Sequence, residues 1–134
     1  MGLIRFLLDT DFCVHAIRKR TPAVTKFLSE VSDEMALTEV TLYELYYGAE
    51  RYDIPETRLA VVEDFRKRFP ILPFDIEAAR HAANIRATLE RQGKPIGNLD
   101  TLIAGIARSQ NLTLISGNTR EFSRVKNLKL KSWR

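Results

Sequence analysis

The sequence contains three carboxylates that are far apart along the chain but that folding could bring together around one bound ion: Asp9, Glu44 and Asp100. Asp9 directly follows an apolar run, residues 3–8, that is typical of a buried strand. In open α/β sheets ligands bind just outside the carboxyl ends of the strands, so Asp9 is expected at that edge. Carboxylates that converge there repel one another and stay ionised when a cation lies between them.

The donor atoms indicate which cation would bind. Oxygen ligands without His or Cys partners select a hard ion such as Mg²⁺ or Mn²⁺. His15 and His81 have no second ligand at metal spacing, and Cys13 is the single cysteine. A hard cation held by few carboxylates keeps water molecules, one of which can attack a phosphodiester. The predicted chemistry is therefore metal-dependent phosphodiester hydrolysis.

Each candidate residue also has a purely structural interpretation. Asp9 could be a turn residue or a helix cap, Glu44 an exposed helix residue, and Asp100 a charge that favours the first turn of a helix. Asn118 and Glu121 have the Asn-x-x-Glu spacing of a capping box, which favours a structural role. The hypothesis of a site rests on the placement of all of them on one side of the predicted sheet.

The elements that position these residues alternate between strands and helices. Strands are predicted at residues 3–8, 35–38, 71–74, 112–116 and 128–130, the last at an edge, with helices between them. This alternation predicts an α/β fold, a three-layer α/β/α sandwich with a mainly parallel sheet of about four to five strands. Asp11, Asp75 and Asn98 are predicted to cap the helices that follow them.

Size and charge narrow the class of protein. The 134 residues, 45% of them apolar, suffice for one compact core, so residues 1–134 are expected to form a single domain. Lys and Arg number 21 against 17 Asp and Glu, and the net charge of +4 suits a polyanionic partner. Candidate phosphate contacts are the basic residues Arg18, Lys19, Arg20, Lys94, Arg120 and Arg124.

Nothing in the sequence predicts a membrane segment. No apolar run approaches the ~18 residues that span a bilayer, and the start of the chain lacks the pattern of a signal peptide. A single cysteine excludes an internal disulfide and favours a reducing compartment. We expect a cytoplasmic protein.

Four segments of the chain carry ordered motifs: residues 7–10 (LLDT), 38–49 (TEVTLYELYYGA), 96–104 (IGNLDTLIA) and 117–133, which begins GNTREF. Together they resemble the successive motifs of PIN-domain ribonucleases, and they are most similar to the VapC toxins of type II toxin–antitoxin pairs. The resemblance covers nearly the whole chain.

The resemblance implies Mg²⁺- or Mn²⁺-dependent cleavage of RNA, usually by a homodimer, and inhibition by a small VapB-like antitoxin that blocks the active-site groove. It suggests a structured RNA substrate, such as a tRNA or rRNA loop. Asp9, Glu44 and Asp100 match the family's metal-binding acidic positions and are the predicted catalytic residues. Asn118 stands where the family often has Asp, so the site could hold one metal or two. Asn118, Glu121 and Asp11 are candidate weak or water-mediated ligands.

Two other functions fit parts of the sequence. Asp9-Thr10-Asp11 resembles the Asp-x-Asp opening of haloacid-dehalogenase-type phosphatases, although Phe12-Cys13 replaces the usual Gly-Thr and no later Asp pair is present. A catalytically inactive PIN-like module that binds RNA or a protein is the second alternative, because Asn118 replaces a charged ligand.

Overall fold

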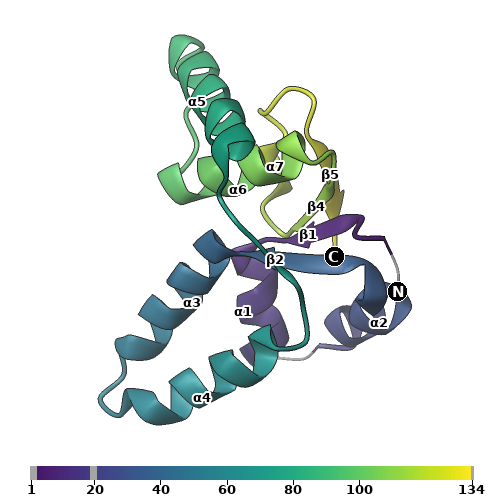
Figure 1. The fold of residues 1–134 in the computed structure, drawn as a ribbon, viewed down its shortest axis with the longest axis vertical. Helices are drawn as coiled ribbons and strands as arrows, with labels where there is room; N and C mark the ends of the chain where they lie inside the picture. The colour runs from purple at the N-terminus through teal and green to yellow at the C-terminus, as the bar shows by residue number, and fades with distance from the viewer. Residues whose placement is uncertain (1–2, 19–20, 134) are drawn as a thin grey trace.

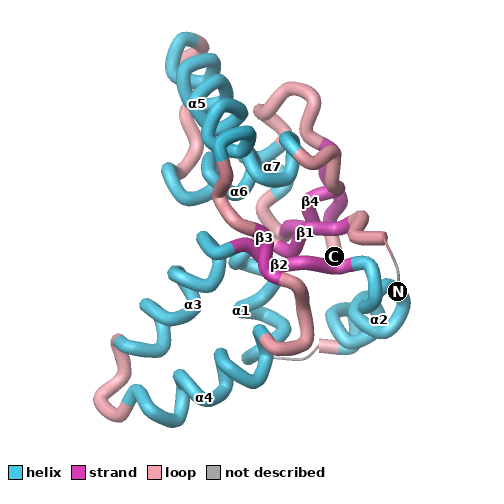
Figure 2. Tube along the Cα trace, viewed as in Figure 1, coloured by secondary structure: helices cyan, strands magenta, loops and turns pink. Residues whose placement is uncertain are grey.

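A parallel β-sheet forms the centre of the molecule. The chain is described by a computed structural model for residues 3–18 and 21–133, without the side chains of residues 30–32. The sheet of this part of the chain has the strand order β3-β2-β1-β4-β5, and every neighbouring pair is parallel. Its strands are β1 (Phe6–Leu8), β2 (Met35–Thr38), β3 (Ile71–Leu72), β4 (Thr113–Ser116) and β5 (Lys129–Ser132). Figure 2 shows these strands as one layer between the helices.

Helices cover both faces of this sheet. They are α1 (Thr10–Arg18), α2 (Pro22–Val31), α3 (Glu39–Glu50), α4 (Pro55–Arg66), α5 (Ile76–Arg91), α6 (Asn98–Ser109) and α7 (Thr119–Phe122). In Figure 1, helices α5 to α7 lie above the sheet and α1 to α4 below it, with α3 and α4 forming an arm that extends away from it. The predicted α/β/α sandwich with a parallel sheet is confirmed.

Strand β1 is the middle strand, and its residues contribute to both cores. Leu7 packs with α5 and α6, whereas Phe6 and Leu8 pack with α1, α2 and α3. All three side chains are buried, as expected for a parallel strand with helices on both faces. The strand is shorter than predicted: it begins at Phe6, although the backbone of Arg5 already hydrogen-bonds to Glu34 and Thr113 on either side.

Helices α5 and α6 pack closely because Gly105 has no side chain. A Cβ atom at Gly105 would lie 2.8 Å from both the carbonyl oxygen of Ala78 and the Cβ of Ala82 on α5. Ile103, Ala104, Ile106 and Ala107 are all fully buried, so α6 is enclosed over most of its surface. The direction of α6, and therefore the place of Asp100 in its first turn, is fixed by this packing.

Of the three predicted N-cap residues, the structure confirms one and shows that two are wrong. Asp75 caps α5, since its Oδ1 accepts a hydrogen bond from the Ala78 amide at 2.9 Å. Asp11 does not cap α1: the helix begins one residue earlier, and Asp9 accepts the amide of Phe12 instead. Asn98 is the first residue of α6, whose N-cap is Gly97, with no capping hydrogen bond from a side chain.

No helix in residues 3–18 or 21–133 combines the length and the apolar character that a membrane span requires.

Candidate active site

Asp9 is a buried carboxylate at the carboxyl end of β1. Its backbone amide still pairs with Ile115 of β4 at 3.1 Å, and its Oδ1 accepts the Phe12 amide at 2.8 Å. The residue is 2% exposed. Burial raises the pKa of Asp9 to about 7, against hydrogen bonds from Ser116 and the Phe12 amide that lower it; the charges of Asp11 and Asp100 raise it further. Asp9 is therefore both a helix cap and an unfavourably placed negative charge.

Asp100 faces the same region from the first turn of α6. Burial raises its pKa to about 6, and the negative charges of Glu44, Glu121 and Asp11 add to that effect. These neighbours belong to α3, α7 and α1, segments far apart in the sequence. The fold thus gathers the acidic candidates into one electrostatically coupled group, in which each further negative charge costs free energy.

Glu44 is held at this group by a threonine that follows Asp9. The Thr10 hydroxyl donates to Glu44 Oε1 at 2.6 Å, and its oxygen lies 3.1 Å from Thr41 Oγ1. A threonine hydroxyl has one proton, so Thr41 is the donor in the second hydrogen bond. Thr41 is fully buried and Glu44 half-buried. This chain of hydroxyls connects α1 to α3 and directs Glu44 towards the end of β1.

Asn118 and Glu121 interact with each other, but not as a capping box. Asn118 Nδ2 donates to Glu121 Oε2 at 2.6 Å, and the Asn118 side chain makes no capping hydrogen bond to α7. The backbone amide of Asn118 instead donates to Ser116 Oγ at 2.7 Å. The predicted capping box is therefore wrong, because the amide side chain acts as a donor that holds the Glu121 carboxylate.

The structure adds three hydroxyl residues that the sequence did not single out: Thr10, Thr41 and Ser116. Ser116 is fully buried and hydrogen-bonds to the Asp9 side chain while accepting the Asn118 amide. Thr10 and Thr41 were visible only as neighbours of predicted ligands, Thr10 directly after Asp9 and Thr41 three residues before Glu44. Their contacts span 31 residues or more along the chain, which no local pattern reveals.

The donor set fits a hard divalent cation better than a soft one. Asp9, Glu44, Asp100 and Glu121 offer carboxylate oxygens, which Mg²⁺ and Mn²⁺ prefer. Burial, with the charge of Asp9, raises the pKa of the Cys13 thiol well above its usual range, so it is no thiolate ligand. Among the described residues no three Asp, Glu, His or Cys side chains are close enough to form a preformed metal cage. The carboxylates therefore lie in one region, but the described side chains do not form a complete coordination shell.

The predicted phosphate contacts are spread over the surface. Arg18, Lys94 and Arg120 are exposed, and Arg124 donates to the Pro95 carbonyl at 3.0 Å. Lys19 and Arg20 lie outside the described residues.

Comparison with known proteins identifies the family. A model of the PIN domain matches residues 6–128. The chain is 43% identical over 131 residues to the tRNA(fMet)-specific endonuclease VapC of Shigella flexneri, covering 98% of this chain and 99% of that protein. It is 40% identical over the same length to the ribonuclease VapC2 of Haemophilus influenzae, with the same coverage of both chains.

Solved structures agree with this match. The DNA-bound VapBC structure from Salmonella typhimurium contains a chain with 38% identity and a TM-score of 0.95, covering 98% of this chain and 100% of that one. VapBC2 of Rickettsia felis, bound to a promoter DNA fragment, gives 32% identity and a TM-score of 0.92. This chain belongs to the PIN domain family and is an endoribonuclease toxin of the VapC type from a type II toxin–antitoxin system.

Proposed function

We propose that Asp9, Glu44 and Asp100 bind Mg²⁺ or Mn²⁺ and that this site hydrolyses RNA phosphodiester bonds. The observation that carries the proposal is the placement of Asp9, buried at the end of β1, within electrostatic reach of Asp100 in the first turn of α6, and the pKa of both carboxylates is raised there. In the metal-free protein, burial and the neighbouring carboxylates make the ionised form of Asp9 unfavourable in free energy. A divalent cation would stabilise the ionised form, because it neutralises these charges. When bound, the cation supplies an activated water and stabilises charge on the leaving oxygen.

The chain's own residues have distinct tasks in this proposal. Asp9, at the end of β1, and Asp100, at the start of α6, would hold the cation as deprotonated carboxylates. Thr10 keeps Glu44 directed into the site. Ser116 donates to Asp9, which keeps that carboxylate oriented. Glu121, held by Asn118, supplies the negative charge that the amide at position 118 lacks.

For the substrate we propose a tRNA, because relatives with 43% and 38% identity are named as tRNA(fMet)-specific endonucleases. The proposal is tested by incubating initiator tRNA with the wild type, Asp9→Asn and Asp100→Asn, in Mg²⁺, in Mn²⁺ and in EDTA. Cleavage is expected only for the wild type with metal, while tRNA binding survives both substitutions. Equal cleavage by all three proteins, or cleavage in EDTA, would refute it. tRNA binding without cleavage by the wild type would favour an inactive binding module.

A small VapB-like antitoxin is the proposed protein partner. Between α1, α3 and α4 lies a pocket of about 80 Å³ lined mainly by apolar residues such as Val14, Ile17 and Val62, and Glu44 forms part of its wall. An apolar segment placed there would lie beside the carboxylates and exclude RNA. Added antitoxin should stop tRNA cleavage, and substituting Val61, an exposed residue that also lines the pocket, by Asp should weaken that inhibition. Unchanged inhibition would place the antitoxin elsewhere.

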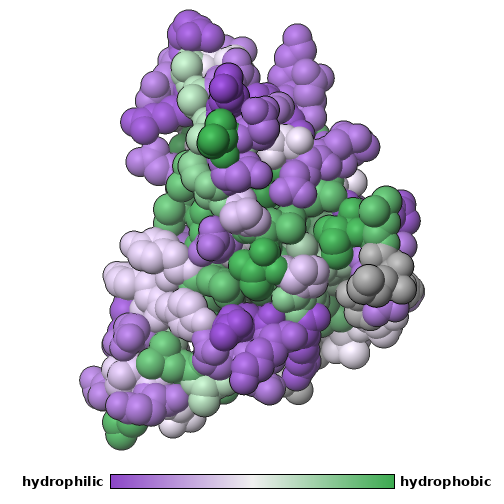
Figure 3. Space-filling view, viewed as in Figure 1, coloured by the Kyte–Doolittle hydropathy of each residue, from purple (hydrophilic) through white to green (hydrophobic). Residues whose placement is uncertain are grey.

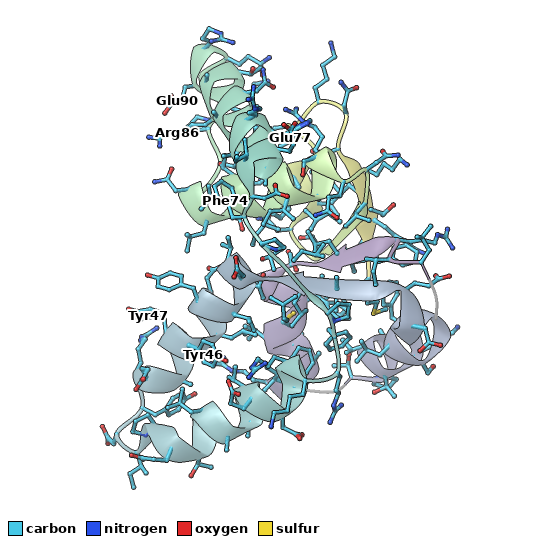
Figure 4. All side chains as sticks on the ribbon, viewed as in Figure 1. Tyr46, Tyr47, Phe74, Glu77, Arg86 and Glu90 are labelled. Atoms are coloured by element: carbon cyan, nitrogen blue, oxygen red, sulfur yellow. The ribbon has the colours of Figure 1, made fainter. Side chains whose placement is uncertain are left out.

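The arm that frames this pocket is held together by polar contacts. The Tyr46 hydroxyl on α3 donates to Glu63 on α4, and Arg66 Nη2 donates to Glu63 Oε2 at 2.7 Å. Arg66, then Tyr46, lowers the pKa of Glu63 to about 2, so the carboxylate stays charged. Figure 4 shows Tyr46 on the side of α3 that faces α4.

We propose that the protein forms a homodimer through a face that carries exposed apolar side chains. Tyr43, Tyr47 and Ile76 are 61%, 58% and 72% exposed. A groove between α5 and α6 is lined by Phe74, Leu102 and three alanines, with Arg86, Asn98 and Thr101 as its polar residues. Figure 4 labels Tyr47 and Phe74 on this face, and Figure 3 shows hydrophobic residues gathered at its centre. Exposed patches of this kind mark interaction sites. Light scattering should give a dimer mass that Ile76→Asp lowers; a monomeric wild type would contradict this.

A further inference from the structure

A polar pocket lies on the side of α6 that packs against α5, away from the carboxylates. It has a volume of about 310 Å³ and is bounded by α5, by the end of α6 and by the segment that follows α7. Three of its lining residues are cations, Arg108, Arg124 and Lys126, and none is an acid. The remaining polar lining residues are Asn84, Thr88, Gln92 and Asn127. A pocket with this composition favours an anion.

Arg108 is fixed in the pocket without a negative partner. Its Nε donates to His81 Nδ1 at 2.9 Å, its Nη2 to Asn84 Oδ1 at 2.8 Å and its Nη1 to the Lys126 carbonyl at 3.1 Å. All of these acceptors are neutral, and no acidic residue of the described chain forms an ion pair with Arg108. Burial lowers the pKa of its guanidinium, because the charge is partly removed from water. An anion in the pocket would offset that cost.

The pocket is connected to the catalytic end of α6. Arg124 lines the pocket and also donates to the Pro95 carbonyl, in the loop that leads to Gly97 and Asp100. Arg108 is eight positions after Asp100 on α6, which corresponds to a distance of about 12 Å along the helix axis. With the axial rise of one strand of B-form DNA, about 3.4 Å per nucleotide, as the scale, this separation corresponds to a few nucleotides.

We propose that this pocket binds a backbone phosphate of the RNA substrate, a few nucleotides from the bond that is cleaved. Arg108 provides a rigid positive charge, and Arg124 and Lys126 contact the phosphate directly. Phosphate contacts position a nucleic acid without reading its sequence, so the pocket would set which bond reaches Asp9 and Asp100. The inference rests on the proposed RNA cleavage at the carboxylate site.

Arg108 also bridges α5, α6 and the Lys126 segment, so replacing it would disturb the fold. The test therefore keeps Arg108 and uses Arg124→Gln with Lys126→Gln. The matched control, Lys26→Gln with Lys67→Gln, removes the same charge from α2 and from the end of α4, on the other face of the sheet. All variants carry Asp100→Asn, and binding of fluorescent initiator tRNA is measured in EDTA across a salt series.

The pocket variant should bind tRNA about tenfold more weakly, and the slope of log Kd against log salt should fall by about one for each lost phosphate contact. The control should change Kd less than about twofold. Equal effects of the two pairs, or no effect of the pocket pair, would overturn the inference. In proteins that keep the native Asp100, the pocket pair should raise KM for tRNA cleavage by a larger factor than it lowers kcat. The wild type could fail to cleave tRNA while the pocket pair still weakens tRNA binding more than the control pair does. That result would refute the proposed cleavage and support the phosphate site.

Discussion

Thr10 donates its hydroxyl proton to Glu44 across a 2.6 Å hydrogen bond that joins the residue after Asp9 to the middle of α3. Groups that orient a metal-binding side chain typically contribute 10–100-fold to affinity or activity. Thr10 is therefore a positioning residue of the proposed site. It acts through Glu44, and the buried Thr41 hydroxyl sets the direction of its own proton.

Replacing Thr10 by Val keeps the shape of the side chain and removes the hydrogen bond to Glu44. We expect tRNA cleavage to fall by about 10–100-fold and Mn²⁺ to bind more weakly, because Glu44 loses its fixed direction. Thr10→Ser retains the hydroxyl and should cleave at close to the wild-type rate. The comparison is made by single-turnover cleavage and Mn²⁺ titration, and wild-type values for Thr10→Val would contradict the positioning role.

Replacing Asp9 by Asn should stabilise the metal-free protein at neutral pH. The pKa of Asp9 is about 7 in the fold against 3.8 for an ordinary Asp, so the folded state binds this proton more tightly than the unfolded chain. Stability from Asp9 is therefore present below about pH 4 and is lost as pH rises towards 7. The Asn variant keeps the oxygen that accepts the Phe12 amide and avoids the buried charge.

The free energy of unfolding of Asp9→Asn should exceed that of the wild type by on the order of 1–3 kcal/mol at pH 7.5, and by less at pH 5. Urea unfolding in EDTA at both pH values measures the difference. Asp53→Asn is the control, because it makes the same substitution in the exposed turn before α4, away from the carboxylate site. A destabilised Asp9→Asn at pH 7.5 would mean that the cap of α1 requires the full carboxylate charge.

Metal affinity should rise steeply between pH 5.5 and 7.5. The pKa values of Asp9 and Asp100 are about 7 and about 6, so both carboxylates must lose protons before a cation binds. Glu44, Glu121 and Asp11 face the same region, and their charges oppose that loss in the metal-free state. Calorimetric titration with Mn²⁺ in two buffers of different ionisation enthalpy should detect proton release below pH 7. Affinity that does not change with pH would argue against these ligands.

Asn118→Asp should destabilise the metal-free protein and increase the stabilisation that a bound metal provides. The substitution removes the donor that lies 2.6 Å from Glu121 Oε2 and places a second negative charge there. We expect a lower melting temperature in EDTA and a larger increase on adding Mn²⁺ than in the wild type. Asn118→Ala, which removes the donor without adding charge, should weaken the response to Mn²⁺. A larger response for Asn118→Ala would contradict the role given to Asn118.

The fold was predictable because its signals are local and strong. The apolar segments around Leu7, Ala36 and Leu114 indicate strands that are covered on both faces, and all three residues are fully buried. Asp75 caps α5 as predicted, because its carboxylate has a free amide within one helical turn. The acidic candidates could be placed on one side of the sheet because the carboxyl ends of parallel strands share an edge.

The remaining details depend on contacts that a sequence pattern does not contain. Asp9 and Asp11 are both possible caps of α1, and the choice follows from the end of β1, where the Asp9 amide still pairs with Ile115. Asn118 and Glu121 have the spacing of a capping box, but the nearby Ser116 hydroxyl accepts the Asn118 amide. Such alternatives differ by about 1 kcal/mol, so tertiary neighbours decide between them.

Gly105 fixes the position of the helix that carries both Asp100 and Arg108. A larger residue there would collide with Ala78 and Ala82, so the distance between α6 and α5 depends on this glycine. Asp100 and Arg108 are carried by that one rigid segment. A larger side chain at position 105 would move Asp100 and Arg108 together, so the distance between the proposed metal site and the proposed phosphate site is set by the length of α6 and not by its packing on α5.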